Sequence, residues 1–141
     1  MPPRQLTLTC MPARYAICRL APGAEIPRWA IAKHFFSVTR TAEELSITCE
    51  ESAVPVDAGA AIPGSAVATC AISKGWRGLK IEGPFDFSAV GVLASVLAPL
   101  ASGKISIFAV STYDTDYLFI QEAAFDRAQQ LLTAQGHLVR S

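Results

Sequence analysis

Two short polar and glycine-containing runs are the most informative residues of this chain for its chemistry. The first run is GPFDFS at residues 83–88, and the second is STYDTD at residues 111–116. Carboxylates such as Asp86, Asp114 and Asp116 accept hydrogen bonds from an ammonium group, and the backbone N–H groups at a helix start attract a carboxylate. A zwitterionic small molecule would satisfy both kinds of group, so the two runs predict a binding site.

Each run follows an apolar segment with the pattern of a β-strand. Leu79 and Ile81 alternate with polar neighbours, which predicts a half-buried strand over residues 77–82. Residues 105–110 form a continuous apolar stretch, which is typical of a buried strand. With one helix between these two strands, both polar runs should emerge at the same edge of one sheet.

The segment between the two runs is predicted to be a helix. Asp86 or Ser88 can cap its N-terminus, Pro99 should bend or shorten its last turn, and Ser102-Gly103 should end it. Its apolar residues at helical spacing are Leu93, Val96 or Leu97, and Leu100. The predicted helix start, residues 88–91, is therefore suited to an α-carboxylate, and Gly91 would allow close approach to the backbone.

The rest of the second half completes the pattern of one small α+β domain. Residues 117–120 read as a return strand, a second helix begins at Glu122 and ends near Gly136, and residues 137–139 can form a last strand. The inward residues of this second helix are expected to be Phe125, Ala128 and Leu132. The order strand, helix, strand, strand, helix, strand is the βαββαβ unit of the ferredoxin-like fold, with an antiparallel sheet.

The first half is predicted to be a degenerate copy of the same unit. Its expected elements are strands at residues 14–20, 35–39, 45–50 and 66–72, a helical turn at 26–30, and a Pro/Gly/Ala-rich stretch at 54–64 in place of a second helix. The chain is therefore predicted to contain two tandem domains, at residues 1–73 and 74–141. This prediction depends on the order of elements alone.

Composition excludes several classes of function. Twelve basic residues balance twelve acidic ones without a basic cluster, so nucleic acid is not a predicted partner. The longest apolar stretch, residues 89–101, is shorter than the roughly 20 residues of a membrane span, and no signal peptide is indicated. We therefore expect a cytoplasmic protein that does not interact with membranes.

No catalytic or metal-binding motif is visible in the sequence. The four cysteines lack a CxxC motif and zinc-like spacing, and we expect them to be reduced and in or near the core. The chain shows no nucleophile–base pair and no phosphate-binding loop. We therefore predict neither an enzyme nor a metal or other cofactor.

The phrases GWRGLKIEGPFDFS, GVLASVLAPLA and ISIFAVSTYDTDYLFI resemble the tandem ACT-domain proteins related to the Castor-type arginine sensors. The phrase SVTRTAEELSITCEES is similar to the N-terminal ACT-like domain of that group. The resemblance implies two ferredoxin-like domains that bind a small ligand, usually an amino acid, and change the behaviour of a partner. It also implies a pocket between the loop at residues 83–91, together with Asp116, and a neighbouring ACT domain.

The two runs and the resemblance together define the predicted ligand-binding residues. These are Asp86, Phe87, Ser88, Ala89, Val90, Gly91, Thr112, Tyr113, Asp114 and Asp116. Purely structural roles remain open for several of them, because Asp86 or Ser88 can serve only as a helix cap and Asp114 only as a turn residue. Tyr113 can contact either a ligand or a neighbouring subunit. Because the site is acidic, we expect a neutral or basic amino acid.

Two functions from different classes fit these observations. The first is a non-catalytic amino-acid sensor that forms a homodimer and regulates a downstream protein. The alternative is a protein-interaction module of the same fold that assembles through its sheet edges without a ligand.

Overall fold

The computed structural model describes residues 5–31, 34–59, 70–85 and 89–141. The chain forms two compact units, and each is described here by itself. One unit, called the 13–75 unit, contains residues 13–75; the other, called the 76–141 unit, contains residues 76–141 and the segment that ends at Pro12. Two long strands supply residues to both units: β1 (Thr7–Leu20) and β4 (Ala71–Ile81).

The 76–141 unit contains both α-helices of the described chain. Beside its parts of β1 and β4, its elements are α1 (Val92–Ser102), β5 (Phe108–Ser111), β6 (Asp116–Gln121), α2 (Glu122–Ala134) and β7 (Leu138–Arg140). Strand β6 pairs antiparallel with β4 on one side and with β5 on the other. Strand β7 pairs with β1 in parallel, with Thr7 opposite Leu138.

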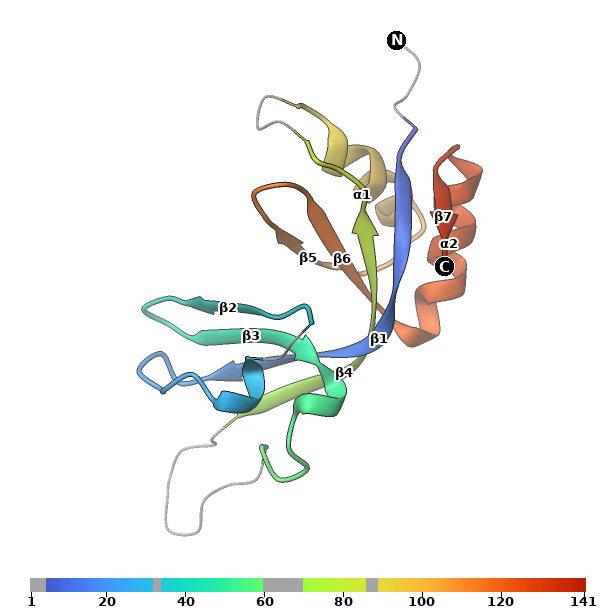
Figure 1. Cartoon of the computed structure of the whole chain (residues 1–141). Coiled ribbons are helices and arrows are strands. Elements are labelled where there is room, and N and C mark those ends of the chain that lie inside the picture. The colour runs from blue at the N-terminus through green and yellow to red at the C-terminus, as the bar shows by residue number, and fades with distance from the viewer. Residues whose placement is uncertain (1–4, 32–33, 60–69, 86–88) are drawn as a thin grey trace. The chain divides into compact units, whose positions relative to one another are not determined.

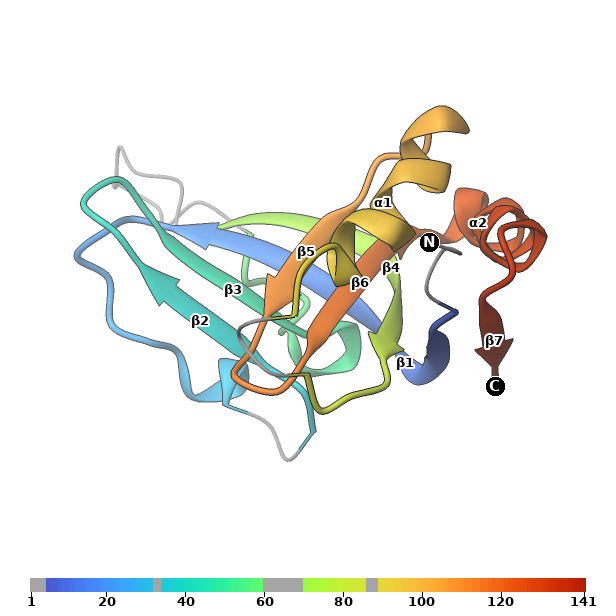
Figure 2. The ribbon, with the colours of Figure 1, turned by 90° about the horizontal axis from the view of Figure 1, so that it is seen from above.

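Side chains alternate between the two faces of each strand, so one face of the sheet presents apolar side chains to the helices. Leu79 of β4 lies opposite Leu118 of β6, and both are fully buried. The same core cluster contains the inward residues of both helices, so α1 and α2 cover the same face of the sheet, as Figure 2 also shows. These helix residues are Val92, Val96 and Leu100 of α1, and Phe125, Ala128 and Leu132 of α2.

Beside its part of β4, the 13–75 unit contains three antiparallel strand segments. Strand β3 (Leu45–Glu50) lies between β1 and β2 (Ser37–Arg40), with Cys18 opposite Ile47 and Val38 on the other side of Ile47. Two short 3-10 turns, η1 (Arg28–Ala30) and η2 (Glu51–Ala53), complete its described elements. Its core contains three thiols, those of Cys18, Cys49 and Cys70. Figure 1 shows these elements along the chain.

The predicted α+β class is confirmed, with a mainly antiparallel sheet and two helices. The inward residues of α2 are as predicted, and Gly136 follows the end of that helix in the left-handed conformation. The degenerate ferredoxin-like domain expected in the first half stays a prediction. The domain boundary between residues 73 and 74 also stays a prediction.

Three predicted element boundaries were wrong. Strand β1 begins at Thr7 rather than residue 14, and its first residues lie between β7 and β4 in the sheet of the 76–141 unit. Strand β5 begins at Phe108 rather than residue 105, because the N–H of Ile105 donates to the carbonyl of Leu100 and continues the helix end. Residues 71–81 form one continuous strand, whereas the sequence predicted two.

The start of α1 also differs from the prediction. The helix begins at Val92, with Gly91 as its N-cap, so residues 88–91 are not its first turn. Val92 is buried, and Leu93, which was predicted to face inward, is half-buried and packs against the same core. Pro99 lies inside the helix, which ends at Ser102 with Gly103 as its C-cap, as expected.

Within the described residues, neither α-helix has the length and apolar composition that crossing a membrane requires.

Candidate functional site

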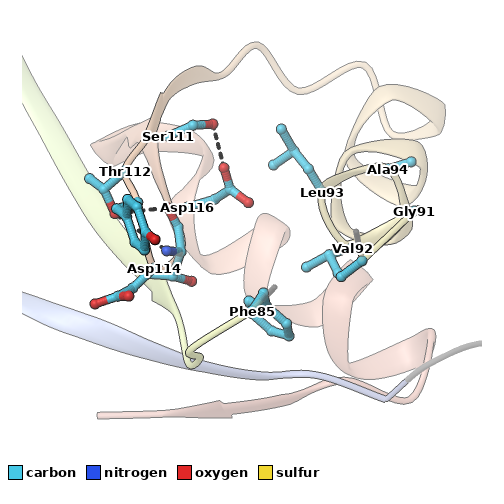
Figure 3. A pocket seen from close by; sticks show the side chains of 12 residues that line it. Phe85, Gly91, Val92, Leu93, Ala94, Ser111, Thr112, Asp114 and Asp116 are labelled. Carbon is cyan, nitrogen blue, oxygen red and sulfur yellow. Dashed lines mark hydrogen bonds between the residues drawn. The ribbon is translucent and has the colours of Figure 1, made fainter. Parts of the chain in front are cut away.

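A cavity of about 350 Å³ opens at one edge of the 76–141 unit, between the start of α1 and the turn that joins β5 to β6 (Figure 3). All of its lining belongs to this unit. The residues that line it are Phe85, Ala89, Gly91, Val92, Leu93, Ala94, Ser111, Thr112, Tyr113, Asp114, Thr115 and Asp116. One wall is therefore apolar and comes from α1 and the loop before it, and the other is polar and comes from the β5–β6 turn.

The N-terminus of α1 borders the cavity, and no described residue caps it with its side chain. Gly91, the N-cap residue, has φ of 80°, a left-handed conformation that glycine adopts at little cost. The first backbone bond of the helix runs from the N–H of Ser95 to the carbonyl of Gly91. The N–H groups of residues 92–94 precede this bond, and the first turn has no acidic residue. These donors are therefore suited to a carboxylate brought by a ligand.

The β5–β6 turn is held rigid by its own hydrogen bonds. The N–H of Thr112 donates to the carbonyl of Thr115 at 2.8 Å, and the Thr112 hydroxyl donates to the same carbonyl at 3.0 Å. The Thr112 Oγ1 in turn accepts from the N–H of Thr115 at 3.3 Å. The Thr112 hydroxyl, predicted to contact a ligand, is thus engaged within the turn.

Backbone contacts bring the two polar runs together. The N–H of Phe85 donates to the carbonyl of Asp114 at 2.8 Å, and the Thr115 hydroxyl donates to the carbonyl of Ile81. A Cβ atom on Gly83 would lie 3.0 Å from the carbonyl oxygen of Asp114, so glycine permits this close approach. The turn is therefore fixed directly against the end of β4.

The two described aspartates of the site differ in their surroundings. Asp116 is half-buried, accepts a hydrogen bond from the Ser111 hydroxyl, and its carboxylate points toward α1 in Figure 3. Asp114 is exposed, and its carboxylate points away from α1. None of the described lining residues carries a positive charge, so the cavity wall is acidic.

Six of the ten predicted site residues line this cavity: Ala89, Gly91, Thr112, Tyr113, Asp114 and Asp116. Val90 lies between two of them in the sequence, but its side chain is 89% exposed and is not part of the lining. Asp86, Phe87 and Ser88 lie outside the described residues. The ligand-binding role of all ten residues stays a prediction.

Sequence reasoning missed six lining residues: Phe85, Val92, Leu93, Ala94, Ser111 and Thr115. Ser111 and Thr115 lie inside the second polar run, so their proximity to Asp116 was a usable signal. Leu93 was assigned to the core from its helical spacing; it packs against the core while partly buried, and it also lines the cavity.

No group of three or more His, Cys, Asp or Glu side chains that could hold a metal ion occurs in the part of the chain that the structure describes. Thiols of the 13–75 unit are buried, and Cys10 of the 76–141 unit is half-buried, with its Sγ accepting from the Gln129 amide at 3.2 Å.

Comparison with known proteins places this geometry in a family. Residues 71–134 match the family model described as ACT domain, and residues 13–57 match a separate model described as an N-terminal domain. Protein Atu0741 from Agrobacterium tumefaciens, solved by X-ray crystallography, is 33% identical to this chain. The comparison covers 98% of this chain and 95% of Atu0741, with a TM-score of 0.84. The chain belongs to the same family as Atu0741. Its second half is an ACT domain.

More distant structures share the fold of this ACT-domain protein. The regulatory subunit of aspartate kinase from Thermus flavus is 13% identical, with a TM-score of 0.61, over 96% of this chain and 99% of that one. VC0802 from Vibrio cholerae, described as a possible transport protein, is 19% identical, with a TM-score of 0.63, over 89% and 85% of the two chains. At these identities the likeness is one of fold alone.

Proposed function

We propose that this protein is a non-catalytic regulatory protein that binds a small molecule, an amino acid, in the cavity of its ACT domain. The observation that carries the proposal is the N-terminus of α1, which no described side chain caps, across the cavity from the carboxylate of Asp116. The helix N–H groups would bind the α-carboxylate of the ligand, and Asp116 would bind its α-ammonium. This pair of contacts is specific for a zwitterion.

The charge of the lining restricts the class of amino acid. Asp114 and Asp116 contribute two negative charges, and the described lining contributes no positive one. An acidic side chain would be repelled, so the ligand is a neutral or basic amino acid. Binding of glutamate in preference to arginine would contradict this assignment.

The comparisons support a regulatory role. ACT domains generally bind small molecules, and the Thermus flavus protein of the same fold is a regulatory subunit. The resemblance to the Castor-type sensors supports an amino-acid ligand, and a relation to those sensors remains part of the proposal without naming arginine as the ligand. We further propose a cytoplasmic homodimer that acts on a downstream protein, with neither nucleic acid nor a membrane as partner.

Thermal unfolding with each proteinogenic amino acid at millimolar concentration tests the proposal. A ligand that binds only the folded state stabilises it by about 2.7 kcal/mol at one hundred times its dissociation constant. We expect stabilisation by a small subset of amino acids and its loss in Asp116→Ala. Unchanged unfolding with every amino acid would contradict the proposed function.

One observation favours the alternative of a protein-interaction module. Val90 and Tyr113 are 89% and 78% exposed and belong to the two segments that border the cavity. Exposed apolar and aromatic side chains of this kind are typical of contact surfaces. A module of this class would show a concentration-dependent oligomer, weakened by Val90→Asp, without any response to amino acids. Sedimentation velocity at several protein concentrations distinguishes the two functions.

A further inference from the structure

Three of the four cysteines lie together in the core of the 13–75 unit. Cys18 belongs to β1, Cys49 belongs to β3, and Cys70 directly precedes β4. Because β1 lies between β3 and β4 in the sheet, Cys18 occupies the middle position. All three belong to one core cluster, are at most 6% exposed and carry free thiols. This thiol cluster lies outside the cavity of the ACT domain and has no part in the proposed function.

The thiols of the cluster contact one another directly. The Cys18 thiol forms one hydrogen bond with the Cys49 thiol and another with the Cys70 thiol. Two sulfur atoms held in contact react with each other far more readily than with a reagent in solution, because their encounter costs no further entropy. Cys10 provides a contrast, since it packs against the core of the other unit and its Sγ accepts from the Gln129 amide.

Strand register separates the two pairs that Cys18 could form. Cys18 lies opposite Ile47 and Cys49 lies opposite Ala16, so these two cysteines are diagonal neighbours on antiparallel strands. Diagonal neighbours have Cα atoms about 7–8 Å apart, whereas a disulfide usually spans about 4.4–6.8 Å between them. Cys70 precedes the first residue of β4, so no strand ladder fixes its backbone. Disulfide geometry therefore favours the pair of Cys18 and Cys70.

We infer that Cys18 and Cys70 form a modification site at which a peroxide introduces a disulfide bond, while Cys49 remains a thiol. The Cys70 thiolate attacks one oxygen of hydrogen peroxide, the O–O bond breaks, and the departing hydroxide takes up a proton to become water. The Cys18 sulfur then attacks the resulting sulfenic acid, the S–S bond forms, and a second water leaves. Two thiols and one hydrogen peroxide thus give one disulfide and two waters.

Exposure and acidity both make Cys70 the member of the pair that meets the oxidant first. Cys70 is 6% exposed and Cys18 is 1% exposed. Burial and the neighbouring Cys18 raise the pKa of Cys70 to about 11, and the hydrogen bond with Cys49, together with burial, raises the pKa of Cys18 more strongly. The bond with Cys18 lowers the pKa of Cys49, but this residue is 0% exposed and its link to Cys18 would require backbone movement.

Peptide mapping of the oxidised full chain tests this inference. The protein is treated with hydrogen peroxide at pH 9, quenched in acid, alkylated in urea and digested for mass spectrometry. We expect one linked peptide pair that contains Cys18 and Cys70, with Cys49 alkylated and the link removed by dithiothreitol. Because only the thiolate attacks the peroxide, the link should form about tenfold or more faster at pH 9 than at pH 7.

Two serine variants and a melting measurement complete the test. Cys49→Ser should form the link as wild type does, whereas Cys70→Ser should leave Cys18 unlinked. Circular dichroism of each reduced variant checks that it is folded before oxidation. The link restricts the unfolded chain between residues 18 and 70, so the oxidised wild type should melt at a higher temperature than the reduced protein. This rise should be absent from Cys70→Ser.

Other products of oxidation would overturn the inference. These are a link between Cys18 and Cys49, a link that includes Cys10, sulfinic or sulfonic acid at Cys70 without a link, or four unmodified thiols. Each product is identified by mass without any amino-acid ligand, so the inference stands or falls separately from the proposed function.

Discussion

The backbone N–H of Leu6 donates a hydrogen bond to Nδ1 of His137, at 3.1 Å, although the two residues lie 131 positions apart in the chain. The other ring nitrogen, Nε2, lies 3.1 Å from the carbonyl oxygen of Ser95 in α1. Since Nδ1 accepts, Nε2 carries the proton and donates to that carbonyl. His137 is only 5% exposed and stands directly before β7. Its buried side chain therefore connects the N-terminal segment to α1.

Removing this imidazole should destabilise the 76–141 unit. His137→Ala leaves the N–H of Leu6 and the carbonyl of Ser95 without a partner, and each buried polar group left unsatisfied costs about 1–3 kcal/mol. Urea unfolding followed by circular dichroism measures the effect. The exposed His34 offers a matched control, because His34→Ala removes the same side chain at the surface. Equal losses in the two variants would contradict the linking role of His137.

Gly91 and Gly136 provide a second matched pair. Both have positive φ, 80° and 91°, and a Cβ atom on either would meet nothing within 4 Å. Replacement by alanine should therefore lower the free energy of unfolding of each variant by a similar amount, about 1–2 kcal/mol. Only Gly91→Ala changes the cap of the helix at the cavity, so only this variant should reduce the thermal shift produced by an amino acid. A similar reduction in Gly136→Ala would point to a global effect instead.

The acid stability of the protein should depend on Glu82. Its carboxylate accepts from the Thr9 hydroxyl at 2.8 Å, and this bond, followed by the charges of Lys80 and Arg140, lowers the pKa of Glu82. A carboxyl whose pKa is lower in the folded state stabilises that state above the unfolded pKa of about 4.3, and the stabilisation disappears as the pH falls through the folded value.

Unfolding free energies measured between pH 7 and pH 3 test whether Glu82 stabilises the protein at neutral pH and loses this effect in acid. Glu82→Gln should lower stability at pH 7 and reduce the loss on acidification, so that the variant and wild type converge at low pH. Glu43→Gln, at an exposed residue of the other unit, serves as the control and should follow the wild-type curve. A variant curve parallel to that of wild type over the whole range would refute the assignment.

The four cysteines should separate by reactivity in the native protein. Burial, the Cys18 charge and a hydrogen bond with Cys18 raise the pKa of Cys70 to about 11, and the hydrogen bond with Cys49, together with burial, raises that of Cys18. Because only the thiolate attacks an alkylating reagent, these thiols should react slowly at pH 8. Cys10 is half-buried and should react first.

Mass spectrometry after brief iodoacetamide treatment measures this order. We expect Cys10 to carry the label in the native protein and all four cysteines to carry it in urea. Cys10→Ser should remove the native label. Rapid native labelling of Cys70 would mean that the core of the 13–75 unit opens readily.

Local patterns explain why much of the ACT domain was predictable. Apolar residues at periods of two and 3.6 identified the strands and the inward side of α2, and these periods depend only on neighbouring residues. Both polar runs were recognised because they follow apolar strands, and the turn at residues 111–116 indeed lies against Phe85.

The features that were missed depend on contacts between distant parts of the chain. No local pattern indicates that β1 and β4 continue through two units, because a strand's sequence does not specify its partners. The cap at Gly91 was missed because Asp86 and Ser88 are better cap residues in isolation. The pairing of the N-terminal segment with the 76–141 unit, where Leu6 is bonded to His137, was likewise not foreseen.

The sequence by itself determined the α+β class, the positions of most helices and strands, and an acidic run next to a helix start, because each follows from residues within a few positions of one another. Only the tertiary structure decided which of the two aspartates, Asp114 or Asp116, points its carboxylate toward α1. Asp114 and Asp116 are two residues apart and chemically identical, but the hairpin register places Ser111 opposite Asp116 and turns Asp114 toward solvent. Pairing of strands, which is set by the whole domain, therefore determines the chemistry of the site.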